Sequence, residues 1–241
     1  MLASIVTHAE VCDPKALQGS YGLSFASKTT VGGTPRPVVG VGRLQFDSGN
    51  VSGVTSVSFT GLILGNPVRG TYEAKWDCSV EWRLQDTSGA FQHFSGTMLA
   101  DGARVTFRQT DPGGPDNGLL FRTTNGCSAA SLNGAFAWNL VGDAVDVDTA
   151  LESGQVSLSG LLAADGAGRV SLSAGPDQPW LVAGIYQVRD DCSVEIVLEL
   201  APGGKKPGGI HFQGIIAGHG REILGIQTDP GTAVAFRLHS M

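Results

Sequence analysis

Apolar and polar residues alternate along most of this chain with a period of two. Val80, Trp82 and Leu84 alternate with polar neighbours in the first half, and Val194 and Ile196 do the same in the second. Because successive side chains of a β-strand point to opposite faces, each such segment has one apolar face and one polar face. This pattern is typical of antiparallel sheets, so we expect an all-β protein.

Turn sequences rich in glycine and aspartate divide each half into eight candidate strands. The clearest turns are Asp47-Ser48-Gly49-Asn50, Asp101-Gly102, Asp165-Gly166-Ala167-Gly168 and Gly218-His219-Gly220. The first half predicts strands at about 19–26, 37–47, 50–60, 67–76, 79–86, 91–100, 104–110 and 118–123. The second half predicts strands at about 134–141, 154–164, 169–175, 181–189, 193–201, 210–217, 221–227 and 233–239. Eight strands joined by short turns favour a closed up-and-down antiparallel barrel, which leaves no exposed edge, and a two-sheet sandwich is the alternative.

The second half of the chain repeats the first, at an offset of 114 to 118 residues. The repeated segments include Cys12-x4-Leu17-x-Gly19-x-Tyr21 with Cys127-x4-Leu132-x-Gly134-x-Phe136, His93-Phe94-x-Gly96 with His211-Phe212-x-Gly214, and Gln109-Thr110-Asp111-Pro112-Gly113 with Gln227-Thr228-Asp229-Pro230-Gly231. A repeat of this length is a duplicated domain rather than a solenoid unit. We therefore predict one β-barrel over residues 11–124 and a second over 126–241. The short connection between them predicts two barrels packed side by side, as a covalent pseudo-dimer.

The four cysteines fall two per repeat, at matched positions. The simplest pairing is Cys12 with Cys78 and Cys127 with Cys192, and each bond would close a loop of about 65 residues, worth about 4 kcal/mol in the chain-entropy model. The alternative is four buried free thiols in a cytosolic protein. Their spacing fits neither a redox motif nor a zinc site. Paired cysteines indicate a secreted or periplasmic protein, whose signal peptide we expect to be absent from this sequence because residues 1–6 lack a basic start and a long apolar stretch.

Charge narrows the range of partners. The net charge is −6, and it lies in the second half: residues 1–124 carry ten basic and ten acidic side chains, and the remainder carries six basic and twelve acidic ones. Neither half forms a basic surface, so nucleic acid is not an expected partner. An apolar run of 18 residues does not occur, so we expect no helical membrane span.

Large aromatic residues and two glutamines fall on the inward faces of the predicted strands. We take these as candidate ligand-binding residues: Tyr21, Tyr72, Trp76, Trp82, Gln109, Trp138, Tyr186 and Gln227. Core packing is the alternative for the aromatic residues, and hydrogen bonding to the Thr-Asp-Pro-Gly turn is the alternative for the glutamines. Inward glycines recur at Gly40, Gly42, Gly53, Gly70, Gly96, Gly160, Gly184, Gly214 and Gly225. They allow the strands to coil sharply, and they also leave room for a ligand.

Few residues suggest acid–base or metal chemistry. His93 is placed to pair with Glu81, and His211 with Glu195, but strand parity puts all four on outer faces, which favours surface pairs over catalysis. The segments 26–36 and 141–153 are expected to be long loops of opposite charge, and residues 201–209 a hairpin tip. The second loop contains Asp143, Asp146, Asp148 and Glu152. This cluster lacks the glycine and terminal glutamate of a calcium loop, so we predict no metal and no cofactor.

The repeated Gly-x-Tyr-x5-Cys-Ser, His-Phe and Gln-Thr-Asp-Pro-Gly text resembles an uncharacterised domain of secreted soil-bacterial proteins. The resemblance spans nearly the whole chain, once per repeat. It implies a fold similar to small eight-stranded barrels, namely the lipocalin-like calycins, allene oxide cyclase, dirigent proteins and bacterial barrel cyclases of polyketide pathways. The aromatic, glycine-loosened interior with few polar groups predicts a secreted barrel that binds a small apolar molecule. The alternative is a barrel cyclase or isomerase that templates a polyene or polyketide, with Tyr72, Tyr186, Gln109 or Gln227 donating one hydrogen bond. A structural surface module with filled interiors is the third possibility, and the sequence leaves open whether the protein is an enzyme.

Overall fold

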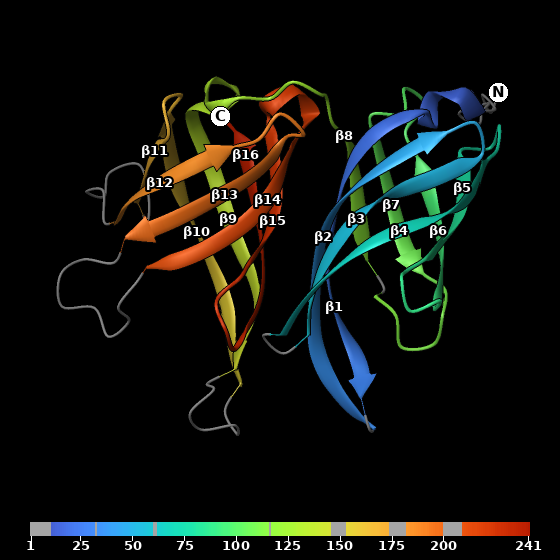
Figure 1. Ribbon diagram of the computed structural model, residues 1–241, viewed down its shortest axis with the longest axis horizontal. Helices are drawn as coiled ribbons and strands as arrows, with labels where there is room; N and C mark the ends of the chain where they lie inside the picture. Colours follow the sequence, from blue (N-terminus) through green and yellow to red (C-terminus); the bar gives the residue numbers. More distant parts are fainter. Residues whose placement is uncertain are drawn as a thin grey trace, which may run out of the picture.

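The computed structural model describes residues 11–31, 33–59, 62–115, 117–145, 153–173, 182–199 and 209–241. Over these residues the chain forms two closed eight-stranded antiparallel barrels, called barrel 1 and barrel 2 (Figure 1), so the predicted fold class is confirmed. Barrel 1 consists of β1 (Gly19–Val31), β2 (Thr34–Asp47), β3 (Asn50–Phe59), β4 (Leu62–Ala74), β5 (Ser79–Gln85), β6 (Phe91–Met98), β7 (Arg104–Gln109) and β8 (Gly118–Arg122). Barrel 2 consists of β9 (Asn133–Val145), β10 (Ser153–Asp165), β11 (Arg169–Ser173), β12 (Val182–Val188), β13 (Ser193–Glu199), β14 (Ile210–Ala217), β15 (Glu222–Gln227) and β16 (Thr232–Ser240). In each barrel every strand pairs with the next, and the first pairs with the last.

Two segments predicted as long loops are largely hairpin strands. β1 and β2 stay paired out to Val31 and Thr34, so the prediction of a loop at 26–36 is wrong. The hairpin projects beyond the barrel, where neither of its faces is fully covered, and the apolar–polar alternation therefore fades. β9 and β10 extend in the same way to Val145 and Ser153, and Asp143 is part of β9. Asp146, Asp148 and Glu152, and residues 201–208 of the predicted hairpin tip, lie outside the described residues.

The two barrel interiors are filled differently. In barrel 1 the ring of Phe46 meets Tyr21, Tyr72 and Trp82 edge-on, with centroids 5.5, 5.1 and 6.3 Å away, and Trp82 stacks on Phe94 at 5.1 Å. Such aromatic pairs add stability beyond the area that they bury. Barrel 2 depends more on aliphatic side chains around a Phe212–Phe236 contact. The shared strand pattern therefore holds two distinct cores.

One end of each barrel is closed by a disulfide and a short 3-10 helix. Both predicted disulfides, Cys12–Cys78 and Cys127–Cys192, are present, and none of the described cysteines is free. Helix η1 (Pro14–Leu17) follows Cys12, η2 (Ala129–Ser131) follows Cys127, and η3 (Gly218–Gly220) joins β14 to β15; η1 and η3 are visible at the upper end in Figure 1. Two disulfides suggest an extracytoplasmic location.

Tyrosine hydroxyls tie the barrel walls to this closed end. Tyr21 donates a hydrogen bond of 2.6 Å to the Gly102 carbonyl, and Tyr186 donates one of 2.8 Å to the Leu132 carbonyl. Burial raises the pKa of Tyr21 to about 12, against the opposing effect of the Arg122 guanidinium. Both hydroxyls therefore serve as neutral structural donors.

At the inward glycines, the space that a Cβ would take is already filled by neighbouring atoms. A Cβ at Gly53 would lie 1.9 Å from the Arg43 carbonyl oxygen, because the coiled strands approach each other closely there. At Gly40 a Cβ would lie 2.3 Å from the Phe25 ring, and at Gly225 it would lie 2.1 Å from the Phe236 ring. These glycines allow coiling and accommodate aromatic rings from the neighbouring strand.

The barrels pack side by side through non-equivalent faces. Val39 and Val41 on the outer face of β2 form an apolar cluster with Ile215, Ile226 and Ala233 from β14, β15 and β16, and Figure 1 shows β2 beside these strands. In this cluster barrel 1 contributes β2, whereas barrel 2 contributes its last three strands. The contact is heterologous, unlike the two-fold contact of a symmetric dimer.

Hydrogen bonds add to this interface. The Ser58 hydroxyl donates to the Thr232 carbonyl at 2.9 Å, and the Thr123 hydroxyl donates to the Ile216 carbonyl at 2.6 Å. Arg237 chelates the buried Glu222 with bonds of 2.8 and 2.9 Å, and its guanidinium lies over the ring of Phe121 in barrel 1. Pairing with Glu222 raises the pKa of Arg237 above its ordinary value, so this interfacial cation stays charged.

Candidate functional site

Barrel 1 has a half-enclosed cavity of about 180 Å³ at the end opposite its disulfide. We call this end the mouth of barrel 1. Its wall is mainly apolar and comes from β1, β2 and β3, from β5, β6 and β7, and from the β7–β8 connection. The lining residues are Leu23, Phe25, Thr29, Val38, Thr55, Val57, Phe59, Leu84, Gln92, Phe94, Gln109 and Pro112 to Pro115. A concave apolar wall with a few polar groups is the common form of a small-molecule site.

The floor of this cavity is built of packed aromatic rings. Phe94 lines it and stacks on Trp82, with an interplanar angle of 12°. Beneath them Trp82 contacts Phe46 and Phe107 edge-on, at 6.3 and 5.1 Å. Described residues that line the mouth include no acidic, basic, histidine, cysteine or tyrosine side chain. The geometry suits binding of an apolar body better than acid–base chemistry.

Gln109 is the polar side chain of the mouth whose amide is bonded to a neighbouring carboxylate. Its Nε2 donates to Asp111 Oδ2 at 3.1 Å, and the same carboxylate accepts the His93 backbone amide at 2.6 Å and meets His93 Nδ1 at 2.8 Å. Desolvation alone would raise the pKa of Asp111, but the hydrogen bonds from His93 and Gln109 outweigh it and lower that pKa below its ordinary value of 3.8. The carboxylate therefore acts as a charged acceptor that fixes both neighbours.

The second repeat contains the equivalent hydrogen-bond network. Gln227 Nε2 donates to Asp229 Oδ2 at 2.8 Å, and His211 contributes its backbone amide at 3.0 Å and its Nδ1 at 3.1 Å. The repeated His-Phe and Gln-Thr-Asp-Pro-Gly segments thus meet in space, and both glutamines do bond the turn aspartate.

The histidine partners predicted from sequence are wrong. His93 lies opposite Arg83 in the strand register, and Glu81 lies opposite Ser95 and pairs instead with Lys75 at 3.4 Å. In barrel 2 Glu195 likewise pairs with Arg189, at 2.5 Å. The turn aspartates are closer because β6 pairs with β7, and Asp111 lies two residues after the end of β7; β14 and β15 place Asp229 in the same way.

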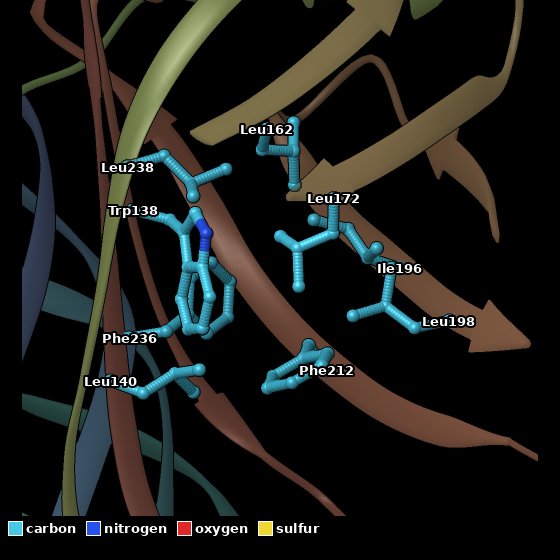
Figure 2. Close-up of a pocket in the computed structure, with 9 residues that line it drawn as sticks. All are labelled: Trp138, Leu140, Leu162, Leu172, Ile196, Leu198, Phe212, Phe236 and Leu238. Atoms are coloured by element: carbon cyan, nitrogen blue, oxygen red, sulfur yellow. The ribbon is translucent and has the colours of Figure 1, made fainter. Parts of the chain in front are cut away.

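Barrel 2 holds a much smaller interior cavity, of about 30 Å³. Figure 2 shows its side chains converging from the surrounding strands on a narrow central space. The lining residues are Trp138, Leu140, Leu162, Leu172, Ile196, Leu198, Phe212, Phe236 and Leu238. The one polar atom among these side chains, Trp138 Nε1, donates to the Ser173 carbonyl at 3.3 Å. A space of this size and polarity holds no sizeable ligand without rearrangement.

The candidate ligand residues are therefore divided among several places. Gln109 lines the mouth of barrel 1, and Trp138 lines the cavity of barrel 2. Tyr21, Tyr72, Trp82 and Tyr186 are packed in the cores or tied to the closed ends, and Gln227 is held by Asp229.

The prediction that Trp76 points inward is wrong, because its side chain is 65% exposed. Pairing of β4 with β5 ends at Ala74 and Val80. Lys75 to Cys78 then form a turn, in which the Cys78 amide bonds the Lys75 carbonyl at 3.1 Å. The inward parity of β4 does not extend into this turn.

Sequence reasoning missed the mouth-lining residues Phe25, Val57 and Phe59 as site residues. A usable signal exists: Phe25 continues the inward parity of Tyr21 and Leu23. The sequence does not show that the hairpins project beyond the barrel, which is what exposes these side chains to a shared space.

In the described residues, no helix is long and apolar enough to cross a membrane, and no group of three or more His, Cys, Asp or Glu side chains is placed to hold a metal. No protein-family model and no curated protein matches the chain. The resemblance to secreted soil-bacterial domains stays a prediction.

Solved structures provide distant likenesses. One is the isotype 1 transferrin binding protein B from serogroup B Neisseria meningitidis, with a TM-score of 0.37 and 7% identity, covering 94% of this chain and 75% of that one. Another is a porin-like protein from Bacteroides uniformis, with a TM-score of 0.17 and 9% identity, covering 86% of this chain and 63% of that one. At these TM-scores neither likeness bears on function.

Proposed function

We propose that this protein is a secreted binding protein that holds a small apolar molecule in the mouth of barrel 1. The single observation that supports this most is the half-enclosed cavity of about 180 Å³ with its largely apolar wall. The two disulfides agree with an extracytoplasmic role. Burial of apolar ligand surface against Phe25, Phe59 and Phe94 would supply the affinity.

Binding is preferred to the cyclase alternative on the placement of donors. Of the four side chains expected to orient a polyene, only Gln109 lines the mouth. The Tyr186 hydroxyl lies between two carbonyls at the closed end of barrel 2, and Gln227 is bonded to Asp229. One neutral amide suits recognition better than catalysis.

Replacement of Val57 by tryptophan tests the proposal. Val57 lines the mouth, whereas Val54, on the same strand, is 56% exposed and points away from it. The neutral fluorescent probe N-phenyl-1-naphthylamine should bind the wild type, and Val57→Trp should weaken binding by about tenfold or more because the indole fills the cavity. Val54→Trp is the matched control and should leave the affinity unchanged.

Two outcomes would overturn this assignment. One is equal weakening by Val54→Trp and Val57→Trp. The other is loss of probe binding on Leu172→Trp alone, which would place the ligand in barrel 2.

A further inference from the structure

Among the described polar side chains that line the mouth of barrel 1, Gln109 is the one with a hydrogen bond that sets its orientation. Gln109 ends β7 and lines the cavity. Its amide nitrogen faces the Asp111 carboxylate, at 3.1 Å. A carboxylate can only accept hydrogen bonds, so this contact fixes which end of the amide is nitrogen. The carbonyl oxygen Oε1 is directed away from Asp111.

The side chain is held on two sides before any ligand arrives. Asp111 is itself fixed by the backbone amide and ring of His93, at 2.6 and 2.8 Å. On another side the loop backbone packs against Gln109, since a Cβ at Gly114 would lie 2.6 Å from its Cδ. A group whose rotamer is already fixed loses little entropy when it binds a partner.

Gln109 Oε1 has no hydrogen-bond partner in the described part of the chain, where the amide's only side-chain bond is the one from Nε2 to Asp111. The other polar side chains of the lining are Thr29, Thr55 and Gln92, and the rest of the wall is apolar. An acceptor oxygen beside an apolar wall favours a ligand that brings a donor.

We infer that the ligand of the mouth is an apolar molecule carrying a hydroxyl group, whose O–H donates to Gln109 Oε1. This inference rests on the proposed function and names the ligand class for that site. The apolar body lies against Phe25, Phe59 and Phe94, and the hydroxyl lies at the β7 side of the cavity.

Barrel 2 offers an internal control. Gln227 is oriented by Asp229 in the same way, but it is not among the residues that line the barrel 2 cavity. A change at Gln227 therefore disturbs the same kind of turn network without touching the mouth of barrel 1.

Three neutral probes of nearly equal shape separate the effect of the apolar body from the effect of a hydrogen-bond donor. Naphthalene has no hydrogen-bonding group, 2-methoxynaphthalene has only an acceptor, and 2-naphthol has a donor. Competition against N-phenyl-1-naphthylamine should give 2-naphthol about fivefold higher affinity than the other two, the effect expected of one neutral hydrogen bond. Gln109→Met should abolish this preference, whereas Gln227→Met should keep it.

The outcomes test the hydroxyl assignment separately from the proposed binding function. Failure of all three naphthalenes to bind would contradict the proposed function. Equal binding of all three to the wild type would leave the function standing and overturn the hydroxyl assignment, and so would a preference that survives Gln109→Met. The wild-type series decides the matter even if the Gln109→Met protein is unstable.

Discussion

At the scale of single residues, Asp111 and Asp229 are the centres of the two repeated motifs. Each accepts hydrogen bonds from a glutamine amide and from a histidine backbone amide, and each meets that histidine's ring. Each network links the β6–β7 or β14–β15 pair to the following turn. At the mouth of barrel 1 the same network also orients Gln109.

The charge of Asp111 predicts a pH dependence. Its pKa is lower in the folded protein than the ordinary value of 3.8, so its stabilisation is fully present well above that value and is lost as the pH falls below it. Asp111→Asn should lower the free energy of unfolding by about 1–2 kcal/mol at pH 7, with the difference shrinking as the pH falls below 4. Urea unfolding between pH 3 and pH 7 measures this, and a constant difference across that range would contradict it.

At the scale of strands, close approach explains why some glycines are needed and others are not. Gly53 in β3 and Gly65 in β4 lie on paired strands. A Cβ at Gly53 would lie 1.9 Å from a backbone oxygen, whereas at Gly65 the nearest atom, Ser56 Oγ, would be 3.8 Å away. Gly53→Ala should therefore cost about 2–3 kcal/mol, and Gly65→Ala should be neutral or slightly stabilising. Thermal and urea unfolding of the two variants test this, and equal effects would refute the account of strand coiling.

Strand number, barrel closure and disulfide pairing were predictable because alternation, turn residues and matched cysteines are local signals. The extension of β1–β2 was not, since alternation fades at Lys28 and Arg36, where the hairpin leaves the barrel. The histidine partners depended on strand register, which placed His93 near Asp111 rather than Glu81. The candidate site was predictable only at Gln109, because the mouth depends on how far neighbouring hairpins project.

At the scale of the whole molecule, the heterologous contact leaves two uncovered faces that could continue the assembly. In barrel 2 the positions equivalent to Val39 and Val41 hold Ser157 and Ser159. In barrel 1 the positions equivalent to Ile215 and Ile226 hold Thr97 and Arg108. A heterologous contact leaves one face of each kind uncovered, so further molecules can add to it unless the uncovered faces differ from those in the contact. We expect these polar replacements to limit the contact to one pair of barrels.

Restoring the apolar residues should therefore restore propagation. A variant with Ser157→Val, Ser159→Val, Thr97→Ile and Arg108→Ile should self-associate with rising concentration in light scattering, because its outer faces then match the internal interface. The Ser157→Val, Ser159→Val protein has only one restored face and is the control, which should remain at the wild-type mass. No concentration dependence in the fourfold variant would contradict this explanation.

The most direct test of ligand binding at the mouth of barrel 1 is a crystal structure of the protein with N-phenyl-1-naphthylamine bound. We expect the probe between Phe25 and Phe94, beside Gln109, with the barrel 2 cavity empty of probe. A mouth closed by its own side chains, with the probe inside barrel 2 or nowhere in the protein, would contradict the account.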